Sequence, residues 1–195
     1  MTTRISALFV CGILTASAAC AGTSSTWQDD DAKVVACFEA MDRDPAVQIV
    51  NAKFARRNPT KAQLADSHAA TETEAAQLRL RVQKTRPCRE LRLAAVHTHR
   101  PLLEPAYRIL YYQADQVFEY LMNGWISHGL ANQLSQKSLA AFQDRERQLD
   151  TAKSDGDRRA LSIAWDEQLQ RGHSNPPPDR LKTQCAWNEL NIACE

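Results

Sequence analysis

Apolar side chains recur at helical spacing along most of this chain, and the pattern is clearest between Pro101 and Gly124. There they alternate at intervals of four and three residues, which predicts one long helix with a buried stripe resembling a coiled-coil seam. The stripe consists of Leu103, Tyr107, Leu110, Ala114, Val117 and Leu121. Phe118 continues this side of the helix, whereas Tyr112 and Tyr120 are offset from it and are expected nearer the solvent.

Residues that begin or end helices divide the rest of the chain. Asp, Ser and Thr cap a helix, Pro is favoured in its first turn, and Gly ends it. Such signals are Asp31 before Val34, Val35, Phe38 and Met41, then Asp44-Pro45, a short turn after Asn58-Pro59, a Thr71–Glu74 capping box, Ser127, Asp155-Gly156-Asp157 and Gly172. Pro87 interrupts the helix that Thr71 opens, so either this helix bends or two shorter helices meet. We expect an all-α protein, an irregular bundle of about five or six helices.

Helix signals vanish after the proline run at 176–178, and residues 181–195 are predicted to form a small β-hairpin. If Cys185 lies opposite Cys194, a disulfide would close the hairpin, and the same register would pair Trp187 with Ile192. Its turn lacks the Asn-Gly chemistry of tight hairpins, so the hairpin should depend on packing against the helices.

The N-terminus is typical of an export signal, residues 1–20. Arg4 precedes an apolar run over residues 5–14, and small residues precede Cys20. Cleavage before Cys20 would expose a thiol for lipid attachment, and this lipoprotein interpretation is the one we favour. Cleavage after Ala21 would instead release a soluble periplasmic or secreted protein.

The mature chain of about 175 residues suffices for one domain. We expect a flexible tether over residues 21–31 and a single helical domain over residues 32–195. The apolar run is shorter than the ~20 residues that a membrane-spanning helix requires.

Four cysteines remain in the folded part: Cys37, Cys88, Cys185 and Cys194. In an oxidising compartment an even number predicts disulfides, and pairing neighbours along the chain joins Cys37 to Cys88 and Cys185 to Cys194. A metal site built from all four thiolates is the alternative, but it has no C-x-x-C pair to support it.

The order of several landmarks resembles uncharacterised, exported helical proteins of proteobacteria. These landmarks are Asn58-Pro59-Thr60 with Gln63-Leu64-Ala65-Asp66, Pro87-Cys88-Arg89, the turn Leu121-x-x-Gly124-x-Ile126-Ser127 with Asn132, and the C-terminal Thr-x-Cys segment. The resemblance implies an envelope location and a helical fold, and it implies no activity because the shared motifs are caps, turns and cysteines.

Candidates for chemistry are few. His97 and His99 are two residues apart and point to nearly opposite faces of a helix, so we expect solvated helix-end histidines rather than a metal site. No nucleophile motif or phosphate-binding loop is present. The tyrosines of the predicted seam helix favour core packing, with a tyrosine-lined ligand groove as the alternative.

The charge distribution is uneven although the net charge is only +1. Residues 79–108 hold eight Lys or Arg against two acidic residues, whereas residues 29–44 are acidic. Either the acidic first helix covers the basic one, which we favour, or Arg79, Arg86 and Arg89 remain open for an anionic partner. Nucleic acid is not the expected partner, because no aromatic residues interleave with these arginines.

We therefore expect a non-catalytic, periplasm-facing envelope protein without a cofactor, which binds another envelope protein or an anionic envelope component, with Arg79, Arg86 and Arg89 as candidate contacts. The first alternative is a periplasmic protein that binds a small ligand or metal through His97, His99 and the tyrosines. The second is a cell-wall hydrolase.

Overall fold

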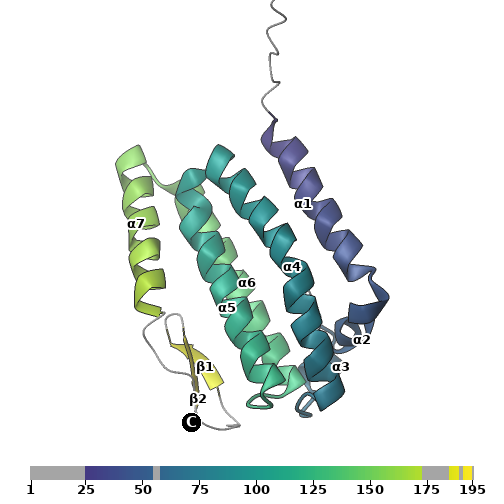
Figure 1. Cartoon of the computed structure of the whole chain (residues 1–195). Helices are drawn as coiled ribbons and strands as arrows, with labels where there is room; N and C mark the ends of the chain where they lie inside the picture. The colour runs from purple at the N-terminus through teal and green to yellow at the C-terminus, as the bar shows by residue number, and fades with distance from the viewer. Residues whose placement is uncertain (1–24, 55–57, 173–184, 189–190, 195) are drawn as a thin grey trace, which may run out of the picture.

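The computed structural model describes residues 25–54, 58–172, 185–188 and 191–194, and its described part is mostly helical, which confirms the all-α prediction. It has seven α-helices, α1 (Trp27–Asp42), α2 (Pro45–Lys53), α3 (Lys61–Leu64), α4 (Glu72–His99), α5 (Glu104–Met122), α6 (His128–Thr151) and α7 (Asp155–Gly172), and a 3₁₀ turn η1 (Pro101–Leu103) before α5. The expected number of five or six was too low, because the short turn after Asn58-Pro59 forms the one-turn helix α3. In the bundle α1 lies beside α4, α4 beside α5, α6 behind α5, and α7 on the side of α5 away from α4 (Figure 1).

Most predicted caps are present. Asp44, Thr71 and Ser127 accept backbone N–H groups at the starts of α2, α4 and α6, and Thr71 forms the predicted capping box with Glu74. The first cap was placed wrongly. α1 begins at Trp27 rather than after Asp31, because Thr26 forms a capping box with Asp29. Residues 27–31 of the expected tether are therefore the first turns of a helix.

Pro87 does not divide the long helix. α4 continues from Glu72 to His99 with Pro87 inside it. Proline lacks an N–H group, so the Gln83 carbonyl loses its helical partner. Both residues lie on the solvent side of α4, where water can bond that carbonyl oxygen.

Buried apolar residues form three clusters. The first, which we call the α5–α6 core, contains Val50, Phe54, Leu78, Val117, Phe118, Tyr120, Leu121, Ile126, Ala131 and Leu134. The second joins α7 to the bundle through Val96, Leu103, Ala106, Ile109, Phe142, Leu149 and Trp165. The third, the α1 core, is the smallest and contains Val34, Phe38, Met41, Val47 and Cys88. α1 therefore packs mainly on this small cluster, and its first residue, Trp27, packs against the second one.

The seam prediction was correct for one side of α5 and incomplete for the other. Leu103, Val117 and Leu121 are buried, but Tyr120, expected near the solvent, is only 2 % exposed. The reason is that α5 is packed against α4, α6 and α7, so more than one stripe of its surface is covered. A single apolar stripe is expected for a helix that packs on one side only, and α5 packs on several sides.

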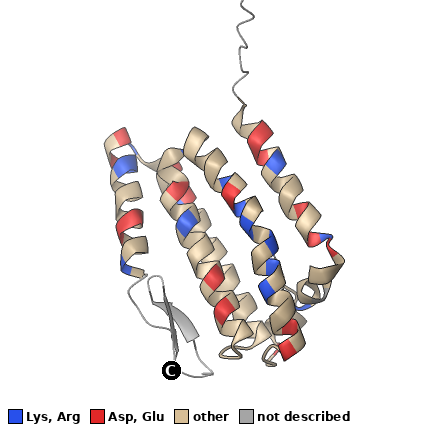
Figure 2. Ribbon diagram, viewed as in Figure 1, with Lys and Arg blue, Asp and Glu red and all other residues tan. Residues whose placement is uncertain are grey.

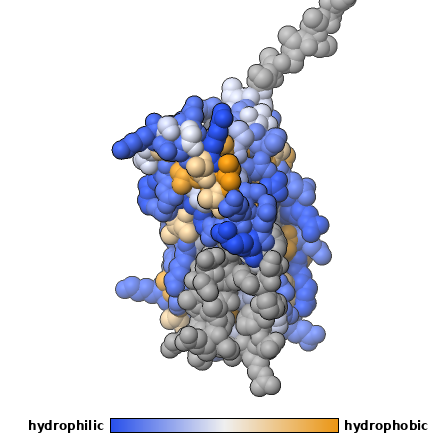
Figure 3. Space-filling view, turned by 90° about the vertical axis from the view of Figure 1, so that its left-hand side faces the viewer, coloured by the Kyte–Doolittle hydropathy of each residue, from blue (hydrophilic) through white to orange (hydrophobic). Residues whose placement is uncertain are grey.

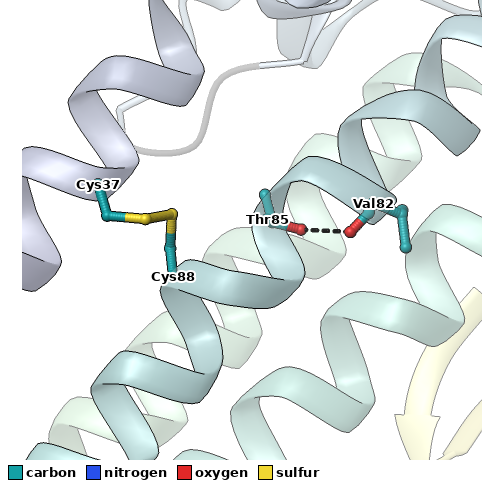
Figure 4. Close-up of a disulfide and its surroundings, with 4 residues drawn as sticks. All are labelled: Cys37, Val82, Thr85 and Cys88. Atoms are coloured by element: carbon teal, nitrogen blue, oxygen red, sulfur yellow. Dashed lines mark hydrogen bonds between the residues drawn. A yellow bond between two sulfur atoms is a disulfide. The ribbon is translucent and has the colours of Figure 1, made fainter.

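The Cys37–Cys88 disulfide is present and joins α1 to α4, with a Cα–Cα distance of 5.5 Å (Figure 4). Cys88 belongs to the α1 core, so the disulfide and the apolar contacts fasten α1 to α4 at the same point.

At the C-terminus β1 (Cys185–Asn188) and β2 (Asn191–Cys194) pair antiparallel, with Cys185 opposite Cys194 along the backbone. The side chains of both strands and the turn between them lie outside the described residues. The Cys185–Cys194 disulfide that would close this hairpin stays a prediction.

The described part of the face on the α7 side is largely hydrophilic (Figure 3). Viewed from the α7 side, a small group of apolar residues is surrounded by polar surface (Figure 3). Ile163 on α7 is the most exposed of the large apolar side chains in the described part, at 59 %. Within the described residues, no helix combines the length and apolar character needed to cross a membrane.

Candidate functional site: an arginine-lined cleft

A cleft of about 210 Å³ lies among α1, α4, α5 and α6, with Phe54 after α2 contributing to one end. Its apolar walls include Phe38, Met41, Leu110, Phe118, Leu139 and Phe142. Two pairs of aromatic rings meet in the lining: the Tyr107 and Phe142 ring centroids are 4.5 Å apart, and those of Phe54 and Phe118 are 4.9 Å apart. The cleft can therefore enclose an apolar group.

Helix α4 supplies the polar side of the cleft. Arg81, Thr85, Arg89 and Arg92 follow one another at intervals of four, four and three residues, which places them along one face of a helix. Three of these four residues are cations, and no Asp or Glu is among the described residues that line the cleft. The cleft is therefore lined mostly by apolar side chains, with a row of three arginines along its α4 side.

Arg81 is the innermost of these cations, at 3 % exposed. Its guanidinium lies 5.6 Å from the Phe54 ring centroid and 5.9 Å from that of Phe118. It donates a hydrogen bond to Asn51 Oδ1, and Asp42 Oδ1 is 3.9 Å away. Arg81 therefore joins α4 to α1 and α2 at the base of the cleft.

Arg89 and Arg92 lie nearer the rim. The Arg89 side chain is 14 % exposed and is paired with Asp115 of α5, whose side chain is 53 % exposed, at 2.5 Å. Its guanidinium also lies 5.0 Å from the Tyr111 ring centroid, close enough for a cation–π interaction. Arg92 is paired in the same way with Asp31 of α1, at 2.5 Å. Each of the two arginines is therefore largely covered and has one carboxylate beside it.

Arg92 is additionally enclosed by two aromatic rings. Its guanidinium is 5.6 Å from the Trp27 ring centroid and 5.7 Å from that of Tyr107. Burial raises the pKa of the Tyr107 phenol, and the opposing effect of Arg92 is smaller. The phenol is therefore neutral at physiological pH.

Two of the hydroxyl groups that line the cleft bond within their own helices. Thr85 donates to the Val82 carbonyl at 2.8 Å, as Figure 4 shows, and Ser138 donates to the Leu134 carbonyl at 3.0 Å. No His, Cys, Asp or Glu is among the described residues that line the cleft. The lining offers cations that can attract an anionic group and rings that can contact an apolar body.

The three arginines proposed from sequence do not form one surface. Arg89 lines the cleft, whereas Arg79 and Arg86 are exposed elsewhere on α4. Much of the remaining basic segment is matched by acidic residues of α1 and the turn after it, as the charge pattern of α1 and α4 in Figure 2 indicates. The pairs are Arg92 with Asp31, Arg81 with Asp42 and Lys84 with Asp44. The favoured interpretation, an acidic first helix over a basic one, therefore describes part of this segment.

The paired histidines do not act together. His97 Nδ1 is 2.8 Å from Glu104 Oε2, and His99 Nε2 is 3.1 Å from Asp30 Oδ2. They lie in the last turn of α4 as expected, although the His99 side chain is mostly covered rather than solvated. Among the described residues, no three His, Cys, Asp or Glu side chains are grouped so as to hold a metal ion.

The tyrosines serve different roles. Tyr107 and Tyr111 are half-buried and line the cleft. Tyr112 instead donates a hydrogen bond to the Gly172 carbonyl at 2.8 Å and so holds the end of α7. Arg81 and Arg92 were not predicted as site residues from the sequence, although their helical spacing from Arg89 could have grouped the three.

Comparison of the chain with known protein families, with characterised proteins and with solved structures gave no match. The interpretation of the cleft therefore depends on its own residues and geometry.

Proposed function

We propose that this is a non-catalytic binding protein of the cell envelope, and that it holds a small ligand in the cleft among α1, α4, α5 and α6. The observation that carries the proposal is the lining, in which three arginines face aromatic and aliphatic side chains in a volume of about 210 Å³. An engineered cavity of about 150 Å³ with an apolar lining is large enough to bind benzene. The cleft is therefore large enough for one ring and a short chain, or for one end of a larger molecule.

Two features support the envelope location. The basic start, the short apolar run and the small residues before Cys20 have the pattern of an export signal, with lipid attachment at Cys20 as the favoured processing. Disulfides persist in oxidising compartments, so the Cys37–Cys88 bond agrees with export. A second disulfide between Cys185 and Cys194 belongs to the same proposal. Fractionating cells that express the wild type and Cys20→Ser tests the anchor: the wild type should be found with membranes and the variant in the soluble fraction.

A pair of matched variants tests the ligand site. Ala114 lines the cleft, and Ala114→Phe should fill it, whereas Ala140 lies exposed on α6 outside the lining, so Ala140→Phe is the control. The probes are 3-phenylpropanol and 3-phenylpropanoate, titrated into the purified protein and followed by NMR chemical shifts. We expect at least one probe to bind the wild type and the control and to lose most of its affinity for Ala114→Phe. Absence of binding by both probes, or equal binding by both variants, would overturn the proposed function.

A partner-binding surface on the outside of α4 is the second candidate, favoured by the exposure of Arg79 and Arg86. Its test is the double charge reversal Arg79→Glu and Arg86→Glu. For this candidate, the variant should bind anionic envelope components less well at low salt and keep its melting temperature. Unchanged binding would remove these two residues from consideration.

A further inference from the structure

The geometry points to the chemical class of the ligand: a small organic carboxylate with a short apolar body, whose acid group binds Arg89 by taking the place of Asp115. This inference rests on the proposed ligand-binding function and names the substrate class of that same cleft. It also assigns separate roles to the three arginines, which the lining alone does not.

Arg81 and Arg92 are committed to the fold. Arg81 is almost completely buried, donates to Asn51 and lies beside the rings of Phe54 and Phe118, so any movement would disturb the contact of α4 with α2. Arg92 is held by Asp31 and has Trp27 and Tyr107 rings nearby. These two arginines contribute positive potential to the cleft without needing to change partner.

Arg89 is differently placed. Its guanidinium lies near the Tyr111 ring and is paired with Asp115, which is outside the described lining but belongs to α5, the helix that supplies Tyr107, Leu110 and Tyr111 to the cleft. The two partners differ in exposure: the Arg89 side chain is 14 % exposed, whereas that of Asp115 is 53 % exposed. Asp115 can thus turn into water and regain its hydration, while Arg89 remains in a largely covered position where an incoming anion interacts strongly.

Exchange of one carboxylate for another keeps the charge of the pair unchanged. The planar guanidinium can bind a ligand carboxylate through two parallel N–H···O bonds, as it would an aspartate. The ligand gains what Asp115 lacks, namely an apolar body that can be buried against Leu110, Leu139 and Phe142 in the same cleft. Affinity therefore depends on both parts of the ligand, and the Asp115 carboxylate acts as a built-in competitor.

The test compares 3-phenylpropanoate with 3-phenylpropanol, which share an apolar body and differ in the acid group, by calorimetry or NMR at pH 7. For the wild type, the carboxylate should bind at least about tenfold more tightly than the alcohol, as charge-assisted hydrogen bonds exceed neutral ones. Arg89→Gln should abolish this preference by weakening carboxylate binding at least about tenfold. Asp115→Asn should tighten carboxylate binding by about threefold to fivefold, because it removes the competitor.

Arg86→Gln is the matched control, since Arg86 is an exposed arginine of the same helix outside the cleft, and it should change neither affinity. If Arg89→Gln does not fold, Asp115→Asn carries the test alone, because it alters one exposed carboxylate and a purely structural pair would not gain affinity on losing it. Equal binding of acid and alcohol to the wild type would overturn the carboxylate assignment while leaving a ligand-binding cleft. Carboxylate binding that Asp115→Asn does not strengthen would overturn the exchange. Absence of binding by both probes would instead overturn the proposed function itself.

Discussion

The two sides of the cleft are held in place by different forces. On the α5–α6 side, Leu121, Ile126 and Leu134 belong to a large apolar core and are fully buried. On the α1 side the apolar core is small, and α1 is joined to α4 by the Cys37–Cys88 disulfide and the Asp31–Arg92 ion pair. A helix with little apolar surface to bury needs covalent and charged contacts to hold its place, whereas α5 and α6 do not.

This difference has a functional meaning under the proposed function. Phe38 and Met41 of α1 line the cleft, so its volume depends on how firmly α1 is held. The α5–α6 side is the rigid wall against which a ligand would pack. Conditions that weaken the fastening of α1, such as reduction of the disulfide, should therefore affect the cleft before they affect the rest of the bundle.

The largest expected effect comes from the disulfide. Cys37→Ser with Cys88→Ser removes a bond between residues 51 apart in sequence. The free energy of unfolding should fall by about 4 kcal/mol, because the unfolded chain regains the entropy of an open loop. Urea denaturation of the variant and of the oxidised wild type measures the loss. An unchanged midpoint would contradict the view that α1 depends on this bond.

A core substitution tests the opposite wall. Leu121→Ala should cost about 3 kcal/mol, because it leaves a cavity among fully buried neighbours. Leu91→Ala is the matched control, since Leu91 is 45 % exposed, and it should stay within about 0.5 kcal/mol of the wild type. Combining Leu121→Ala with the cysteine double variant should give additive losses if the two walls are independent. A strongly non-additive result would break the comparison.

Acid should weaken the polar contacts near the start of α4. Burial disfavours ionisation of Glu74, but hydrogen bonds from Lys53 of α2 and from Thr71 outweigh it and lower its pKa to about 2. Since this value lies below the usual 4.5, ionised Glu74 contributes stability above about pH 4.5, and this contribution is lost as the pH falls toward 2.

Glu74→Gln should therefore cost about 2 kcal/mol at pH 7, because it removes charge-assisted hydrogen bonds. The difference from the wild type in urea denaturation should shrink as the pH is lowered from 5 to about 2. The exposed Glu72→Gln serves as the control and should show a smaller loss. A loss for Glu74→Gln that does not vary with pH would show that packing, rather than charge, is responsible.

The smallest effects distinguish the arginines that were proposed together. Arg89→Glu should lower stability by about 1 kcal/mol, because it replaces a partly exposed ion pair with Asp115 by a repulsion. Arg86→Glu should change stability by less than about 0.5 kcal/mol, because Arg86 is exposed. Thermal unfolding of both variants measures the difference. Equal losses would mean that Arg89 has no special place at the rim of the cleft.

Local signals were sufficient for much of the fold. Asp44-Pro45, the Thr71–Glu74 capping box and Ser127 fix helix starts through contacts within three residues, so the sequence alone located them. The same locality explains the error at α1, where Thr26 and Asp31 are both suitable caps and only the structure distinguished them. The sequence also did not show that α4 continues through Pro87, since a proline can either bend a helix or end it. The helix continues because this turn faces the solvent, where water can bond the carbonyl oxygen that the proline leaves without a partner.

The sequence by itself determined most of the helix starts and the apolar stripes, because backbone capping and helical periodicity are properties of the chain. The even cysteine count favoured the pairing of Cys37 with Cys88 without fixing it, and the structure shows that bond. The tertiary structure decided which stripes were covered, as the burial of Tyr120 shows, and which charges met. It alone brought Arg89 against Asp115 and the Tyr111 ring of α5, since residues 26 positions apart meet only when α4 and α5 pack. The cleft likewise depends on tertiary structure, because its lining comes from helices far apart in sequence. Their relative positions are set by the packing of all their buried surfaces together.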